Sequence, residues 1–226
     1  MDVAGAGPLL EARELYRFYH AGDDETFALR GVSVTVHPGE LVAVVGPSGS
    51  GKSTLLSCLA GLDEPDGGHV AVAGRRMSRR GEDARAALRA RWIGILLQSG
   101  NLLEHLTVAQ NVRMAQRMGR PERRPRPEEL LDQVGLAERA GARPSTLSGG
   151  EAARAGLAVA LANDPPVLLA DEPTGEVDAE SERSLLELLQ ARAAGGGAVV
   201  VVTHSERVAG GATRVVRLSD GRVLDG

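Results

Sequence analysis

GPSGSGKS, residues 46–53, decides the fold predicted for this chain. The letters match the pattern G-x-x-x-x-G-K-[ST], in which glycines let backbone N–H groups wrap around phosphate oxygens. The apolar run LVAVV at 41–45 precedes the pattern and predicts a strand that is buried on both faces of a parallel sheet. A helix is expected at 52–60, directly after the loop. A strand, a glycine-rich loop and a helix in this order indicate a phosphate-binding loop in an α/β fold.

The whole loop is expected to contact a bound nucleotide. The Lys52 ammonium would reach the β and γ oxygens, and the Ser53 hydroxyl can ligate Mg²⁺. A glycine-rich turn with a chance lysine would give the same letters, but the flanking strand and helix favour the phosphate loop. The residues expected in contact with the nucleotide are Gly46, Pro47, Ser48, Gly49, Ser50, Gly51, Lys52, Ser53 and Thr54.

A second apolar strand is expected to end in two acids. VLLADE at 167–172 puts Asp171 and Glu172 at the carboxyl end of a parallel strand, where α/β sheets bind their ligands. Asp171 would hold Mg²⁺ through its water shell, and Glu172 would polarise a water for attack on the γ-phosphorus. Two solvated acids at the start of a helix would have the same sequence, but the predicted phosphate loop elsewhere in the chain favours the magnesium site.

A third apolar strand, VVTHS at 201–205, ends in His204. A lone histidine is more often packed or solvated than catalytic, yet its place at the same sheet edge favours contact with the γ-phosphate and the attacking water. Gln98 closes the run WIGILLQ at 92–98 and could reach Mg²⁺ or water, although a glutamine alone indicates little. The expected catalytic residues are Lys52, Glu172 and His204.

TLSGGEAARAG at 146–156 predicts a second helix end suited to an anion. Ser148 and Glu151 have the spacing of a capping box, and Gly149 and Gly150 leave the first N–H groups of the helix uncovered. A plain capping box would explain Ser148 and Glu151, but not two adjacent glycines.

The remaining patterns predict an alternating fold. Polar and apolar residues at 9–18 and 27–36 indicate an antiparallel hairpin around a GDDET loop, and 106–143 is mostly helical. Short strands are expected at 69–73, 167–170 and 198–202 and in RVVRL and RVLD near the end of the sequence, and helices at 83–91, at 180–193 and from Ser148.

Five segments occur in an order and spacing that resemble the nucleotide-binding subunit of ATP-binding cassette (ABC) transporters, and the resemblance covers essentially the whole chain. These segments are GPSGSGKST, Gln98, LSGGE, VLLADEPTGEVD and VVTHS. DEPTG and the single-cassette length resemble the branch of lipoprotein-release, macrolide-export and cell-division ATPases. The resemblance implies an α/β P-loop NTPase (RecA-like) core with a mostly parallel sheet, an N-terminal antiparallel β subdomain and an inserted α-helical subdomain at about 99–147. It also implies one ABC ATPase domain over residues 1–226, with ATP and Mg²⁺ as cofactors.

The same resemblance implies two partners, a second copy of the chain and an integral membrane permease. Two cassettes would pair head to tail, so that Ser148, Gly149, Gly150 and Glu151 of one copy close over the ATP of the other. Asp178 matches the aspartate that contacts the opposite phosphate loop. Tyr19 matches the aromatic residue that stacks on adenine, although Tyr16 and Phe18 are close by and an aromatic residue of the hairpin core would read the same.

Two stretches depart from the family pattern. EAARAG after LSGG lacks the bulkier residues usual there. Gly156 inside a helix costs about 1 kcal/mol relative to alanine, which predicts a less stable helix. Glu176 and Val177 stand where a small polar residue and leucine are commoner, which adds a negative charge near the expected interface. Neither change removes a group that touches phosphate, so an active enzyme is still expected.

Composition limits the alternatives. The chain has 226 residues, 42% hydrophobic, 2% aromatic, with a formal charge of −4. Although RRMSRR at 75–80 and RPERRPRP at 120–127 are basic, an acidic chain with few aromatics is not expected to bind nucleic acid. The single cysteine, Cys58, excludes an internal disulfide and is expected to be buried. No signal peptide or bilayer-spanning run is read, so a cytoplasmic chain on the inner face of the membrane, held there by its partner, is expected.

The leading functional hypothesis is therefore an ATPase subunit that powers export or extraction of a lipidated or amphipathic substrate by a separate permease. The alternative is a regulatory module that uses ATP-dependent closure to move a membrane partner without transport, as in the cell-division relatives. The residues do not separate these two functions.

Overall fold

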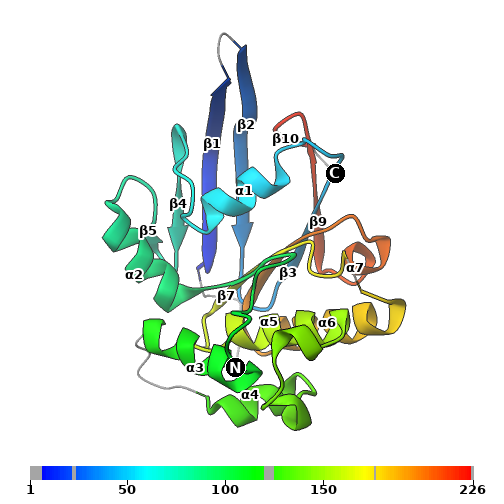
Figure 1. The fold of residues 1–226 in the computed structure, drawn as a ribbon. Coiled ribbons are helices and arrows are strands. Elements are labelled where there is room, and N and C mark those ends of the chain that lie inside the picture. The colour runs from blue at the N-terminus through cyan, green and yellow to red at the C-terminus, as the bar shows by residue number, and fades with distance from the viewer. Residues whose placement is uncertain (1–6, 22–23, 120–124, 176, 225–226) are drawn as a thin grey trace.

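The chain folds around two β-sheets. A computed structural model describes residues 7–21, 24–119, 125–175 and 177–224. The larger sheet has the strand order β10-β9-β3-β8-β7-β6, and the smaller sheet has the order β2-β1-β4-β5 (Figure 1). The strands of the larger sheet are β3 (Leu41–Val45), β6 (Ile93–Leu96), β7 (Val167–Asp171), β8 (Ala198–Val202), β9 (Arg214–Ser219) and β10 (Arg222–Leu224).

The larger sheet is parallel except at β10, which pairs antiparallel with β9. Side chains of one strand alternate between two separate cores: Val200 and Val202 of β8 lie in one, and Val199 and Val201 lie in the other. Because both faces of the sheet are covered, each of these positions must be apolar. The uninterrupted runs at 41–45 and 198–202 are explained in this way, and the prediction of a mostly parallel sheet is confirmed.

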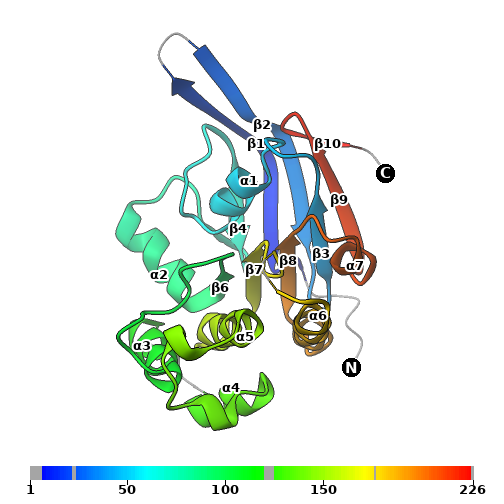
Figure 2. The ribbon, with the colours of Figure 1, turned by 45° about the vertical axis from the view of Figure 1, so that its right-hand side comes forward.

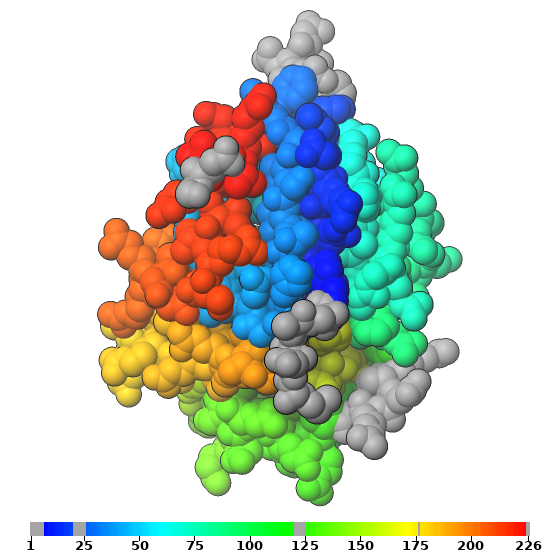
Figure 3. Space-filling view, turned by 180° about the vertical axis from the view of Figure 1, so that it is seen from behind, coloured from blue at the N-terminus to red at the C-terminus, as the bar shows by residue number. Residues whose placement is uncertain are grey.

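The first core lies between the two sheets and includes α1 (Lys52–Leu59), with the buried Cys58. The smaller sheet is antiparallel. Its two N-terminal strands form a long hairpin that projects beyond the rest of the molecule (Figure 2), and from behind they form the surface between the C-terminal strands and the segment that contains α2 (Figure 3). The elements concerned are β1 (Leu10–Ala21), β2 (Asp24–Val36), β4 (Gly67–Val72), β5 (Arg75–Arg76) and α2 (Glu82–Trp92).

Helices cover the other face of the larger sheet and form the second core. The backbone N–H groups of Val108 and Ala109, at the start of α3, donate to the carbonyl oxygens of Ala142 and Ala140 at 2.9 and 3.0 Å, so the segment after α4 caps α3. The helical subdomain expected at 99–147 contains α3, α4, η1 and η2, and its independence as a unit stays a prediction. The helices on this face are α3 (Val108–Gly119), α4 (Pro127–Gln133), η1 (Ala137–Arg139), η2 (Pro144–Thr146), α5 (Gly149–Ala160) and α6 (Ala179–Ala194).

A few boundaries differ from the patterns. Trp92, the first residue of the run WIGILLQ, ends α2, and β6 begins only at Ile93. The centroid of the Trp92 ring lies 5.5 Å from the guanidinium carbon of Arg75. The short helix α7 (Glu206–Gly210) follows β8 and is too short to show a helical period in the sequence. Of the expected GDDET loop and the basic run at 120–127, residues 22–23 and 120–124 lie outside the described residues. Within the described ranges, no helix is both long and apolar enough to cross a bilayer.

Candidate nucleotide-binding site

The carboxyl ends of β3, β8 and β7 lie next to one another, because these three strands are parallel neighbours. The chain that leaves them carries the phosphate loop, His204 and the pair Asp171 and Glu172. A cavity of about 630 Å³ opens at this edge. Ten of the predicted residues line it, namely Tyr19, Ser48, Gly49, Gly51, Lys52, Ser53, Thr54, Gln98, Glu172 and His204.

The backbone shape of the phosphate loop depends on glycine. Gly51 has φ +100°, and a Cβ there would lie 2.2 Å from the carbonyl oxygen of Ala28. The ammonium of Lys52 donates to the carbonyl oxygens of Gly46 and Pro47, both at 2.9 Å, while its side chain leaves α1 and turns back into the loop. Lys52 is only 6% exposed, so the loop surrounds its ammonium group, and the residue still lines the cavity.

Asp171, the last residue of β7, and Glu172, which follows it, have different surroundings. Burial raises the pKa of Asp171, and a hydrogen bond with the Ser53 hydroxyl and the charge of Lys52 act in the opposite direction. Among the described residues, the Asp171 Oδ1 atom is buried and has no hydrogen-bond partner. An unpaired buried carboxylate oxygen is costly unless another group completes it. The site therefore offers an oxygen ligand directly beside the phosphate loop.

Glu172 pairs with His204. The Glu172 Oε2 atom accepts the His204 backbone N–H at 3.1 Å, and Oε1 lies 3.2 Å from the His204 Nε2 atom. Glu172 has φ +43°, a left-handed conformation that non-glycine residues adopt at a cost and that often marks a functional position. Its backbone N–H donates to the Val202 carbonyl oxygen at 2.9 Å, which ties the turn to the neighbouring strand. One histidine thus fixes both carboxylate oxygens.

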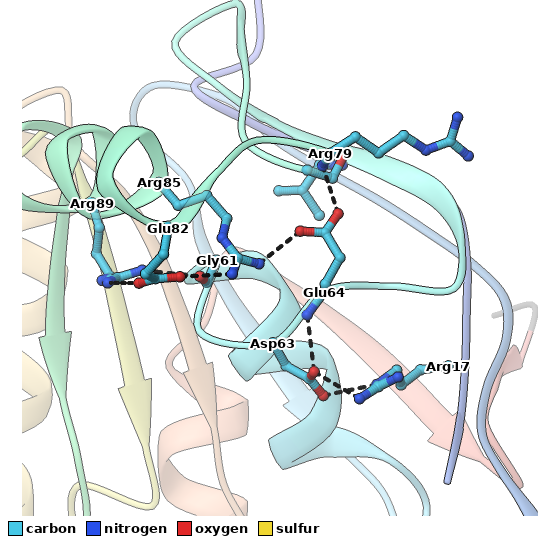
Figure 4. A network of polar contacts seen from close by, with 10 residues as sticks. Arg17, Gly61, Asp63, Glu64, Arg79, Glu82, Arg85 and Arg89 are labelled. Carbon is cyan, nitrogen blue, oxygen red and sulfur yellow. Dashed lines mark hydrogen bonds and ion pairs between the residues drawn. The ribbon is translucent and has the colours of Figure 1, made fainter.

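Tyr19 is the aromatic residue of β1 that lines the cavity. Its hydroxyl donates to the Asp63 Oδ2 atom at 2.7 Å, and the guanidinium carbon of Arg17 lies 4.7 Å from the ring centroid. Figure 4 shows Arg17 paired with Asp63 within a polar network that continues through Glu64 to α2. Tyr16 and Phe18 lie elsewhere: the Tyr16 hydroxyl lies beside Gly31, and the Phe18 ring packs edge-on against Phe27 at 5.3 Å.

The helix end at Ser148 is built as a capping box. The Ser148 Oγ atom accepts the Glu151 N–H at 3.2 Å, and the Ser148 N–H donates to the Glu151 Oε2 atom at 2.8 Å. Ser148 and Gly149 are exposed, whereas Gly150 is buried against α6, where a Cβ would lie 2.0 Å from the Ser181 Oγ atom. Packing is therefore the reason for the glycine at position 150.

Within the described residues, Ser148 through Glu151 do not line the cavity of the phosphate loop. Gly149 lines a separate hollow of about 240 Å³, which also reaches Gln98 and Glu172. Asp178 is exposed and caps α6 by accepting the N–H groups of Glu180 and Ser181 at 3.0 and 2.9 Å. The predicted set thus divides into a phosphate loop with its acids and a separate exposed surface. Glu176, which stands where the family commonly has a small polar residue, lies outside the described residues.

Several contributors to the site were not predicted from the sequence, Gly175 among them. Thr26, Phe27 and Ala28 of β2 line the cavity, and Asp63 holds Tyr19. The β2 residues and Asp63 carry no motif, because they reach the site through the pairing of β2 with β1 and through the turn after α1. Gly156 is explained by packing, since a Cβ there would lie 3.0 Å from side-chain atoms of Leu96 and Asn101.

A phosphate loop between β3 and α1, with carboxylates and a histidine at the ends of neighbouring parallel strands, defines a P-loop nucleotide-binding domain. Residues 29–175 match the family model described as ABC transporter. An uncharacterized ABC transporter ATP-binding protein of Thermotoga maritima is 44% identical over 218 residues, which cover 95% of this chain and 93% of that protein. The chain belongs to the ABC transporter family and is an ABC ATPase domain that binds ATP.

Other relatives agree with this assignment. The macrolide export ATP-binding/permease protein MacB of Hyphomonas neptunium is 42% identical over 220 residues, which cover 96% of this chain. The chain spans about a third of that relative, 34% of its length. The ATP-binding cassette MJ0796, solved as a dimer in a post-hydrolysis state with ADP and Pi, has a TM-score of 0.88 at 33% identity, covering 96% of this chain and 97% of that one.

Proposed function

We propose that this chain binds and hydrolyses ATP between two copies of itself and thereby drives a separate integral membrane permease. One observation carries the proposal: the described part of the chain offers two surfaces suited to phosphate, and only one of these two lines the nucleotide cavity. The phosphate loop lines that cavity, while Ser148 and Gly149 at the amino end of α5 are exposed outside it. A two-fold pairing would bring the α5 end of each copy to the loop of the other and complete both sites.

In this proposal, Lys52 and the loop from Gly46 to Thr54 hold the phosphates. Ser53, Gln98 and Asp171 would hold Mg²⁺, which prefers oxygen ligands. The Asp171 Oδ1 atom supports the fit, because it is buried and has no hydrogen-bond partner among the described residues. When bound, the ion would neutralise charge that develops on the β and γ oxygens. Tyr19 would stack on the adenine, and Asp178 would approach the phosphate loop of the second copy.

Hydrolysis would be carried out by Glu172 and His204. The Glu172 carboxylate is only 20% exposed and is fixed by two contacts from His204, so its orientation toward the cavity is set before a water arrives. It would accept a proton from the attacking water as that water approaches the γ-phosphorus. The His204 side chain is 57% exposed, so its imidazole could also contact the γ-phosphate.

Replacing Tyr19 separates base binding from phosphate binding. Tyr19→Ala is expected to raise the Kd for ATP about tenfold, since base stacking on an aromatic ring contributes about 1–3 kcal/mol. The Kd for inorganic triphosphate is expected to stay unchanged. Tyr19→Phe, which keeps the ring and loses the hydroxyl bond to Asp63, is the matched control and should lose less affinity. Both constants are measured by titration calorimetry, and an equal loss for ATP and triphosphate would contradict the stacking role.

The membrane side of the proposal rests on the relatives. Several are named macrolide export ATP-binding/permease proteins, which favours transport over a purely regulatory role for this chain. We infer a peripheral position on the cytoplasmic face of the membrane, next to a permease that exports or extracts a lipidated or amphipathic substrate.

Purification from detergent-solubilised membranes of the native host tests this function. The tagged chain is expected to hydrolyse MgATP and to bring down an integral membrane protein. If an active chain repeatedly co-purifies with no membrane protein, the proposed ATPase activity is supported and the proposed pairing with a permease is contradicted.

A further inference from the structure

Arg139, at the end of η1, joins the helical region to the amino end of α5. Its Nη2 atom donates to the carbonyl oxygen of Thr146 at 2.8 Å and to the Glu151 Oε2 atom at 3.2 Å, and its Nε atom lies 2.9 Å from the Glu151 Oε1 atom. The guanidinium therefore contacts both oxygens of one carboxylate and, in addition, the loop that leads into α5. A planar guanidinium suits this forked arrangement.

Glu151 has two opposing effects at this helix end. Its carboxylate accepts the Ser148 N–H and completes the capping box, which stabilises α5. The hydrogen bond with the Ser148 backbone, followed by that with Arg139, lowers the pKa of Glu151, so the side chain is ionised at neutral pH. A negative charge beside the N–H groups of Gly149 and Gly150 repels any polyphosphate that approaches them.

The backbone of the same segment is held from the other side. Ala140 and Ala142, on either side of Gly141, accept the first N–H groups of α3, at 3.0 and 2.9 Å. Arg139 is thus anchored to α3 through its neighbours and to α5 through its side chain. The Arg139 side chain is 39% exposed and that of Glu151 is 23% exposed, so the ion pair lies at the surface that carries Ser148.

We propose that Arg139 is a positioning residue for ATP-dependent pairing: it fixes the Glu151 carboxylate in the capping box and cancels its charge, so that the α5 end accepts the triphosphate of a second copy. Arg139 acts through Glu151 and does not touch the nucleotide. The inference rests on the proposed pairing of two chains around ATP.

A double-mutant cycle tests the proposal in the full chain. Each variant carries Glu172→Gln to prevent turnover, and MgATP is titrated while dimer formation is followed by light scattering. Arg139→Ala is expected to raise the half-maximal MgATP concentration about tenfold when Glu151 is present, and less than about threefold when Glu151→Gln has already removed the charge. Arg143→Ala, which removes an exposed arginine from the same segment, is the matched control and should leave the midpoint unchanged.

The outcomes are distinguishable. A Glu172→Gln parent that stays monomeric in MgATP would overturn the pairing itself, and with it the role of Arg139. A parent that dimerises while Arg139→Ala dimerises equally well would overturn only the role of Arg139. An equal loss with and without the Glu151 charge would also overturn it, because a purely structural contribution of Arg139 does not depend on that charge. Monomer folding is checked by thermal melting of each variant.

Discussion

Glu172→Gln is expected to stop ATP hydrolysis while ATP binding and ATP-dependent pairing persist. The amide keeps the size of the side chain and can still accept the His204 N–H, but it cannot take a proton from water. Loss of a general base lowers kcat about 10²–10⁴-fold. Because the triphosphate then stays intact between two copies, the variant should accumulate as a dimer in MgATP. Phosphate release measures the first effect, and light scattering measures the second.

Glu180→Gln is the matched control for this variant. Glu180 is an exposed acid in the first turn of α6, and its loss removes the same charge from the same region. We expect the control to turn over ATP like the wild type and to be monomeric after turnover. A wild type that is no faster than Glu172→Gln would reject the catalytic role of the carboxylate, and a Glu172→Gln chain that stays monomeric in MgATP would reject the sandwich.

Lys52 is the second position with a large expected effect, and it is the single lysine of a chain that contains 26 lysine and arginine residues in total. Lys52→Ala is expected to raise the Kd for ATP about a hundredfold, which corresponds to about 2.7 kcal/mol of lost charge-assisted hydrogen bonding. Lys52→Arg keeps the charge but is expected to raise the Kd for ATP almost as much. A planar, bulky guanidinium cannot replace a compact ammonium that is 6% exposed and is placed between the Gly46 and Pro47 carbonyls.

Mixing two inactive variants adds a test of where the second half of each site comes from. Lys52→Ala lacks a working phosphate loop in both sites of its dimer, and Ser148→Arg blocks the α5 end in both sites of its own. A mixed dimer contains one site in which the intact loop meets the intact α5 end. ATP hydrolysis is therefore expected to reappear on mixing, as measured by phosphate release. If Lys52→Ala binds ATP with wild-type affinity, the role of the lysine is wrong, and if mixing restores nothing, Ser148 does not act across an interface.

The single lysine also makes Lys52 directly observable. Apart from the amino terminus, an amine-directed reagent can modify the chain only at this residue. Protection by MgATP, followed by mass spectrometry of the loop peptide, would report on the wild-type chain without a substitution.

Local sequence was enough for the features that a strand, a loop and a helix specify by themselves. Lys52 and Ser53 could be assigned because the pattern from Gly46 fixes a backbone shape over eight residues, and the apolar runs on either side fix where it sits. Asp171 followed for the same reason, as the last residue of β7. These predictions depend only on neighbours in the chain.

The choice among Tyr16, Phe18 and Tyr19 depended on more than alternation. The pairing of β1 with β2 shifts register between Ala12 and Leu15, between Leu15 and Tyr16, and between Arg17 and Phe18. Each irregularity of this kind changes which face of the sheet the following side chains meet. The local sequence does not encode these shifts, so Tyr19 was predicted only through the family resemblance, and the folded hairpin places it at the cavity.

The sequence by itself determined that this chain carries a phosphate loop, two acids and a histidine at strand ends, and a capped helix with adjacent glycines, because each is a local pattern with a local physical cause. The tertiary structure decided which of these groups meet: the order β3-β8-β7 brings His204 onto Glu172, and the return of the chain through η1 brings Arg139 onto Glu151. Such contacts depend on strand order and on helix packing between segments that are distant in the sequence, so they cannot be predicted from the spacing of residues within one segment.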